Sequence, residues 1–374
     1  MIYLDSAATT FQKPYTVSLS MRDALETMSS PGRGGHALAM CAADVAFRCR
    51  SELAELFHLD NPEHVVFTLN ATHALNIAIK SLIPSAGKVV ISGYEHNAVT
   101  RPLEKLETEV IVARAPLFQQ KATALAFQKL ITSGVDAVIC NHVSNVFGFV
   151  QPIEEIADIC KRKGVPLNID ASQSAGVLPL NMSELGAAFI AMPGHKGLYG
   201  PQGTGVLLCG ENWPVDTLLE GGTGSLSIQQ QMPDFLPDRL EAGTHNMPGI
   251  AGLLSGVQFV RQMGLKHICE KERQLTLLAA ENLRKIPDIR VYSEKGLLAQ
   301  SGVLSFVPLK KNVEEVAVAL GEKGIAVRSG LHCAPLAHQS AGTFETGTVR
   351  ISFSAFNRKD EVYHFIETLK HCLH

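Results

Sequence analysis

The sequence predicts an α/β protein with a mostly parallel sheet in a large domain, followed by a smaller α+β domain. Between residues 65 and 209, short apolar runs rich in Val and Ile alternate with helical segments, which is typical of βαβ units. Beyond residue 250 this alternation stops, and a long helical segment precedes a mixture of short strands and helices. The chain of 374 residues is long enough for two domains.

The expected elements follow in chain order. Residues 1–36 are expected to be irregular, because they contain two prolines and a glycine-rich segment. Helical periodicity predicts a helix over 42–57. Strands are expected at 65–68, 88–92, 110–113, 137–140, 165–169, 187–192 and 206–209, with helices at 72–82 and near Arg101. The later elements are helices at 249–285, 313–323 and 360–372 and strands at 302–307, 325–328 and 349–354. We therefore assign residues 15–250 to the large domain and residues 251–374, together with 1–14, to the small one.

The composition argues against several function classes. The formal net charge of -3 provides no basic surface for nucleic acid or for an anionic membrane. We expect no signal peptide, because the first residues lack a basic segment followed by an apolar one, and no apolar run approaches the roughly 20 residues that span a bilayer. The eight cysteines form no CxxC pair, so we expect neither a zinc site nor a disulfide framework, and we expect the protein in the reducing cytoplasm.

Polar residues follow several of the predicted strands. Because the carboxyl ends of parallel strands lie along one edge of a sheet, these side chains should gather around one ligand site. The segment 70–73 also opens a helix, whose free N–H groups suit a phosphate. The residues concerned are Asn70, Thr72, His73, His96, Asn145, Asp170, Gln173, His195 and Lys196.

Two residues in this sequence could act as nucleophiles. Lys196 follows the apolar run 187–192, and a lysine in such a position can have a lowered pKa and form a Schiff base. A lone loop lysine is usually only solvated, so this prediction depends on its polar partners. Cys333 lies in a loop beside His332, where nearby cations favour the thiolate, whereas Cys140 and Cys209 lie in apolar runs and are expected to be structural.

Taken together, segments from residue 3 to residue 350 resemble the class V branch of the fold-type I pyridoxal-phosphate enzymes, and within it the cysteine desulfurases of the NifS/SufS type. The resemblance implies the aminotransferase type I fold. The segments are residues 3–8, 33–36, 71–72, 95–96, 142–145, 170–173, 194–197, 199–201, 241–244, 328–333 and 349–350.

The resemblance implies pyridoxal 5'-phosphate as the cofactor and gives roles to five residues around its ring. Lys196 is expected to bind the cofactor covalently and to move protons. Asp170 is expected to pair with the ring nitrogen, which then withdraws electrons. His96 is expected to stack on the ring and assist proton transfer, and Asn145 and Gln173 to bind the phenolic oxygen.

At the phosphate, the resemblance implies Thr72, His73 and His195, with Thr244 reaching over from a second subunit of a homodimer. Two positions depart from the family. Pro193 stands where many members have a serine, and His73 stands where many have a glutamate.

For the substrate, the resemblance implies that L-cysteine is bound through its carboxylate by Arg350, with contacts from Asn145, Ala8 and His36. Cys333 is then expected to take the substrate sulfur as a persulfide, leaving L-alanine. The short loop around Cys333 implies that a sulfur-acceptor protein comes to it, although residues 337–345 match no familiar pattern.

Other functions remain open on the sequence. A selenocysteine lyase uses the same scaffold and would act on L-selenocysteine. An epimerase or aminotransferase would not need Cys333. A non-catalytic scaffold would not need the intact set of Lys196, Asp170, His96 and Arg350.

Overall fold

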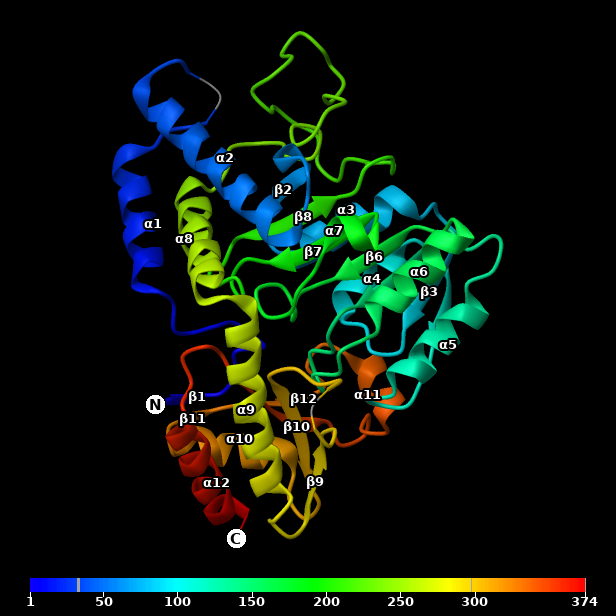
Figure 1. Ribbon diagram of the computed structural model, residues 1–374, viewed down its shortest axis with the longest axis vertical. Coiled ribbons are helices and arrows are strands. Elements are labelled where there is room, and N and C mark those ends of the chain that lie inside the picture. Colours follow the sequence, from blue (N-terminus) through cyan, green and yellow to red (C-terminus); the bar gives the residue numbers. More distant parts are fainter. Residues whose placement is uncertain (32–33, 297, 374) are drawn as a thin grey trace.

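A seven-stranded sheet forms the centre of the computed structural model, which describes residues 1–31, 34–296 and 298–373 (Figure 1). The strand order is β2-β8-β7-β6-β5-β3-β4. All strands run parallel except β8, which pairs antiparallel with both β2 and β7. The predicted mostly parallel sheet is therefore confirmed. The strands are β2 (Val65–Thr68), β3 (Lys88–Ser92), β4 (Glu109–Ala113), β5 (Ala137–Asn141), β6 (Leu167–Asp170), β7 (Phe189–Pro193) and β8 (Gly205–Cys209).

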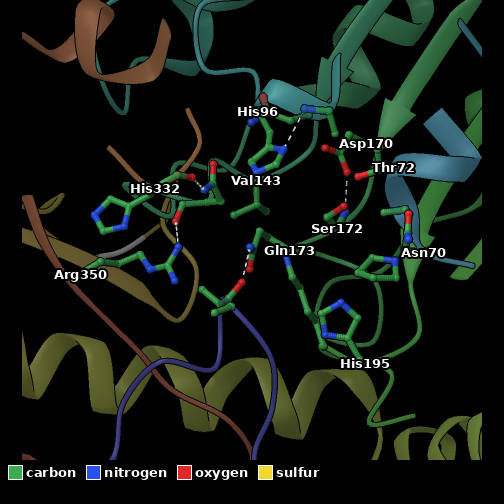
Figure 2. A pocket seen from close by; sticks show the side chains of 18 of the residues that line it. Asn70, Thr72, His96, Val143, Asp170, Ser172, Gln173, His195, His332 and Arg350 are labelled. Carbon is green, nitrogen blue, oxygen red and sulfur yellow. Dashed lines mark hydrogen bonds between the residues drawn. The ribbon is translucent and has the colours of Figure 1, made fainter. Parts of the chain in front are cut away.

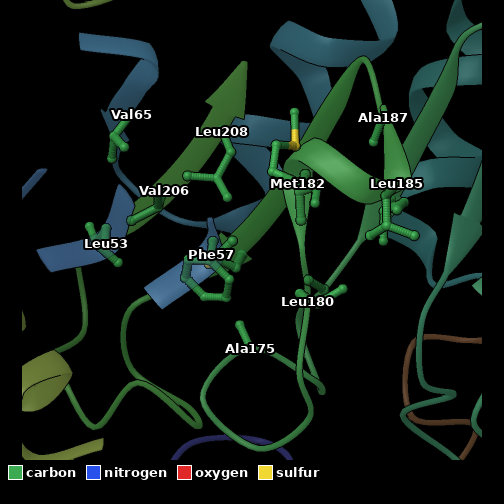
Figure 3. Close-up of a cluster of buried hydrophobic side chains, with 14 of the residues drawn as sticks. Leu53, Phe57, Val65, Ala175, Leu180, Met182, Leu185, Ala187, Val206 and Leu208 are labelled. Carbon is green, nitrogen blue, oxygen red and sulfur yellow. The ribbon is translucent and has the colours of Figure 1, made fainter. Parts of the chain in front are cut away.

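Helices cover both faces of this sheet, which explains why its inner strands are apolar on both sides. The helices on one face are α2 (Ala37–Phe57), α5 (Gln120–Leu130), α6 (Ile153–Lys163), α7 (Met182–Leu185) and α8 (Met247–Met263). Those on the other face are α3 (Ala71–Leu82) and α4 (Asn97–Lys105). In Figure 3, Leu53 and Phe57 of α2 lie near Val206 and Leu208 of β8, within one buried cluster. Burying each such side chain contributes about 1.5–3 kcal/mol.

The second sheet is antiparallel, with the order β12-β13-β10-β9, and belongs to the C-terminal part of the chain. The N-terminal strand β1 (Ile2–Tyr3) pairs with β11 (Ile325–Ala326), so the start of the chain lies beside this part. The remaining elements are β9 (Ile289–Tyr292), β10 (Val303–Pro308), β12 (Arg328–Gly330), β13 (Thr348–Ser352), α9 (Leu265–Leu283), α10 (Val313–Glu322), α11 (Pro335–Ala341) and α12 (Lys359–Leu373).

Two expectations about the helices were wrong. Residues 1–36 are not wholly irregular, because helix α1 (Tyr15–Thr27) begins directly after Pro14 and packs on α8. The expected helix over 249–285 is two helices, α8 and α9, which are separated by Gly264 with φ of 80°. Since residue 250 lies inside α8, and α8 packs on α1 and α2, we infer that the domain boundary lies at Gly264. No helix within the described residues is long and apolar enough to cross a membrane.

Candidate active site

A cavity of about 230 Å³ lies where the carboxyl ends of the sheet strands face the C-terminal part of the chain. It brings together most of the residues that the sequence analysis singled out (Figure 2). The predicted residues that line it are Ala8, Thr72, His96, Asn145, Asp170, Gln173, His195, Lys196 and Arg350.

Lys196 lies in the connection from β7 to β8, at one wall of the cavity. The pKa of its amine is lowered to about 8, mainly by burial and partly by the guanidinium groups of Arg350 and Arg328, whereas Asp170 opposes the shift. Near neutral pH, the uncharged and nucleophilic amine is therefore a larger fraction of this lysine than of an ordinary exposed lysine.

Asp170 ends β6 and His96 follows β3, with β5 between these two strands, and both side chains are fixed by backbone N–H groups (Figure 2). The Oδ1 atom of Asp170 accepts a hydrogen bond from the Ser172 amide at 2.9 Å. His96 caps α4, where its Nδ1 atom accepts from the Ala98 amide at 3.0 Å, so Nε2 carries the proton. Burial lowers the pKa of His96 to about 4, which keeps the ring neutral and suited to stacking on a flat ligand.

The N-terminus of α3 borders the cavity through Asn70, Ala71 and Thr72. This twelve-residue helix supplies free N–H groups and the positive end of its dipole. Pro193, which stands where many family members have a serine, also lines the cavity. His195 lines it as well and contacts the Thr9 hydroxyl through Nδ1 at 3.0 Å.

Besides Cys333, three of the predicted residues lie outside the cavity. His73 and Thr244 line a neighbouring cavity of about 240 Å³, and the Nδ1 atom of His73 accepts from the Leu69 amide. His36 caps α2 on an exposed surface, and Arg33, which belongs to the same segment, lies outside the described residues. Within one chain these residues therefore do not join the others.

Arg350 is almost completely buried, and two groups hold its guanidinium. Nη1 donates to the Asn145 carbonyl at 3.0 Å, and Nη2 donates to the Asp5 carboxylate at 2.6 Å. The side chains of Asn145 and Gln173 are also held: Asn145 donates to the His332 carbonyl at 2.8 Å and Gln173 to the Ala7 carbonyl at 2.9 Å.

Cys333 lies at the edge of this site, in the turn between β12 and α11. Its thiol is exposed, with the Arg328 guanidinium 3.7 Å from Sγ. His332 has φ of 50° and Cys333 has φ of 56°. Two consecutive residues therefore adopt the left-handed conformation, which residues other than glycine rarely adopt. The Asn97 amide holds the Cys333 carbonyl at 2.8 Å, next to His96. This turn is thus tied to the residues around the cavity.

Sequence reasoning missed three residues of the site. Asp5 was given no role, because an ion pair with Arg350 across 345 positions leaves no local pattern. Arg328 belongs to the segment 328–333 but was likewise given no role, although its guanidinium lies next to the Cys333 thiol. His332 also lines the cavity, and its carbonyl and side chain fix the turn that carries Cys333.

Comparisons with known proteins find similar chains over almost the whole sequence. The family model "Aminotransferase class-V" matches residues 2–365. A probable cysteine desulfurase of Methanothermobacter thermautotrophicus is 31% identical, covering 99% of this chain and 94% of its own. A probable cysteine desulfurase of Mycolicibacterium paratuberculosis is 33% identical, but this chain spans only 55% of its length. Among solved structures, the apo cysteine desulfurase of Thermococcus onnurineus superposes with a TM-score of 0.90 at 30% identity, covering 99% of this chain and 94% of its own.

Proposed function

The chain belongs to the class V aminotransferase family, and on that premise we propose that it is a pyridoxal-phosphate-dependent cysteine desulfurase. Its substrate is L-cysteine, and its products are L-alanine and a persulfide on Cys333. One observation carries the proposal: the exposed Cys333 thiol lies in a turn that hydrogen bonds tie to the cavity containing Lys196 and Asp170. Epimerases and aminotransferases do not need that thiol.

The residues that line the cavity fit pyridoxal phosphate. An amine with a lowered pKa is available at Lys196, a carboxylate at Asp170 and helical N–H groups at the start of α3. Among the described residues, the buried Oδ1 atom of Asn145 has no hydrogen-bond partner, which leaves a polar atom for a ligand. Lys196 would hold the cofactor's aldehyde carbon, Asp170 its ring nitrogen, and Thr72 with His195 its phosphate. When bound, the cofactor withdraws electrons from the substrate's α-carbon and makes its proton acidic.

The chain's own residues supply the rest of the chemistry. Arg350 binds the substrate carboxylate, and the uncharged Lys196 amine accepts the α-proton. The Cys333 thiolate attacks the substrate sulfur, so that an S–S bond forms as the C–S bond breaks. The electron pair of the broken bond remains on carbon, which takes up a proton and becomes the methyl group of L-alanine.

We propose a cytoplasmic homodimer in which Thr244 serves the partner subunit's site, and a separate protein that accepts the sulfur. The exposure of Cys333 supports transfer to a second protein, since such a thiol can be reached without opening the cavity. Comparing the turnover of L-cysteine with that of L-selenocysteine distinguishes a cysteine desulfurase from a selenocysteine lyase.

The Cys333→Ala variant tests the proposed function. It should bind cofactor and L-cysteine as the parent does, because Cys333 holds neither, but it should release no L-alanine. Mass spectrometry of the parent after exposure to L-cysteine should find one added sulfur on Cys333. Cys41→Ala, which removes another exposed thiol, is the matched control. Wild-type turnover by Cys333→Ala would contradict the persulfide mechanism.

A further inference from the structure

The arginine that is expected to bind the substrate carboxylate already has a carboxylate partner. Asp5 Oδ1 lies 2.6 Å from Arg350 Nη2, and only 1% of the arginine side chain is exposed. Arg350 nevertheless lines the cavity, and its Nε atom has no hydrogen-bond partner within the described residues. An incoming carboxylate would therefore share the guanidinium with Asp5.

Asp5 cannot easily move away from Arg350, because the segment around it is fixed to β13. The backbone of Asp5 forms a bridge with Ser352. The Ser352 amide donates to the Leu4 carbonyl, and the Ser352 hydroxyl accepts from the Ala7 amide, both at 2.8 Å. The same segment reaches the large domain, where the Ala7 carbonyl accepts from Gln173. Asp5 is thus held in place by both parts of the chain.

We propose that Asp5 is a resident counter-ion of Arg350 that limits how tightly the site binds the carboxylate of an amino acid. The proposal deepens the proposed function, since it concerns the carboxylate of the same substrate. A bound carboxylate next to Asp5 brings two like charges together where solvent screens them poorly. Asp5 thereby weakens the binding of substrate and product alike, and L-alanine leaves more readily.

Asp5→Asn is the direct test, because asparagine keeps the hydrogen-bond acceptor for Nη2 and removes only the charge. Calorimetry of the holoenzyme would compare L-alanine with ethylamine, which has the same amine but no carboxylate. We expect Asp5→Asn to bind L-alanine roughly ten-fold more tightly and ethylamine unchanged. Asp23→Asn, which removes an exposed carboxylate on α1, should leave both affinities unchanged. Unchanged or weaker L-alanine binding by Asp5→Asn would overturn the proposal.

Two further measurements keep the test decisive if Asp5→Asn does not fold. Asp5→Ser carries the same expectation, because serine is also uncharged. In the parent enzyme, L-alanine should bind at most about ten-fold more tightly than ethylamine, since Asp5 offsets the arginine charge, and a larger ratio overturns the proposal. None of these measurements needs sulfur chemistry. Failure of Cys333-dependent desulfuration would therefore count against the proposed function and not against the role of Asp5.

Discussion

Arg350 is a single buried charge whose proposed role in binding the substrate carboxylate can be tested directly. Arg350→Ala should retain the cofactor, because its contact with Asn145 is only to the backbone carbonyl and the residues proposed to hold the aldehyde carbon, ring nitrogen and phosphate are unchanged. The variant removes the only guanidinium proposed to bind the substrate carboxylate and leaves Asp5 unpaired beside it. We expect substrate binding to weaken by about 2–5 kcal/mol. Steady-state kinetics with L-cysteine measure this as a higher KM. Arg358→Ala, at an exposed ion pair, is the control and should change neither constant.

Lys196 has a pH signature that an ordinary lysine would lack. Burial lowers its pKa to about 8, so its uncharged fraction grows as pH rises and is nearly complete one unit above that value. The rate at which cofactor-free protein captures pyridoxal phosphate should therefore rise up to about pH 8–9 and then level off. Borohydride trapping and mass spectrometry at each pH measure the rate and the site. Lys196→Ala should trap nothing, and a rate still rising steeply at pH 10 would contradict the lowered pKa.

At the scale of elements, the loop that carries Lys196 packs so closely on its neighbour that only glycine fits. A Cβ atom at Gly176, whose φ is 82°, would lie 2.1 Å from the Gly197 carbonyl oxygen, directly after Lys196. Gly164, at the end of α6, has φ of 65°, but no atom of the described residues lies within 4 Å of such a Cβ. Gly164→Ala should cost about 1 kcal/mol of unfolding free energy.

Gly176→Ala adds a steric clash to the same conformational cost, and should cost about 1–3 kcal/mol more. It should also weaken cofactor binding, because relieving the clash shifts the Lys196 loop. Urea unfolding of both variants and cofactor titration measure the two effects. Equal losses of unfolding free energy in Gly176→Ala and Gly164→Ala would show that the close packing of the two loops adds no cost for a larger side chain.

The elements that the sequence predicted are those with a local signal. Buried parallel strands are short apolar runs, and the polar residues that follow them share a sheet edge by topology, so Asp170 and Lys196 could be expected together. Helix α1 was missed because its thirteen residues bury only Val17 and Ala24, which leaves little periodicity. The Asp5–Arg350 pair was missed because it joins the two ends of the chain, and only tertiary structure brings them together.

For the whole molecule, the described surface leaves many large apolar side chains exposed. Many of them lie on α1, on α2 and on the connection from β8 to α8. This connection projects from the sheet in Figure 1. Ile228 is 98% exposed and Leu25 is 74% exposed. Exposure of apolar side chains is a feature shared with surfaces that bind another protein. It supports the proposed homodimer, which sedimentation at micromolar concentration should detect. A fully active monomer would contradict it.

A mixing experiment then decides which subunit Thr244 serves. Thr244 lines the cavity beside the α3 N-terminus rather than the one that contains Lys196, so a role at the partner's phosphate is the proposal to test. Thr244→Ala should weaken cofactor binding, and Lys196→Ala should be inactive. If Thr244 acts across the dimer, a mixed dimer of the two variants contains one site with Lys196 from one subunit and Thr244 from the other. Refolding the variants together should therefore restore cofactor affinity and desulfuration at that site. If Thr244 acts within its own subunit, every site with Lys196 still lacks Thr244, and mixing restores nothing.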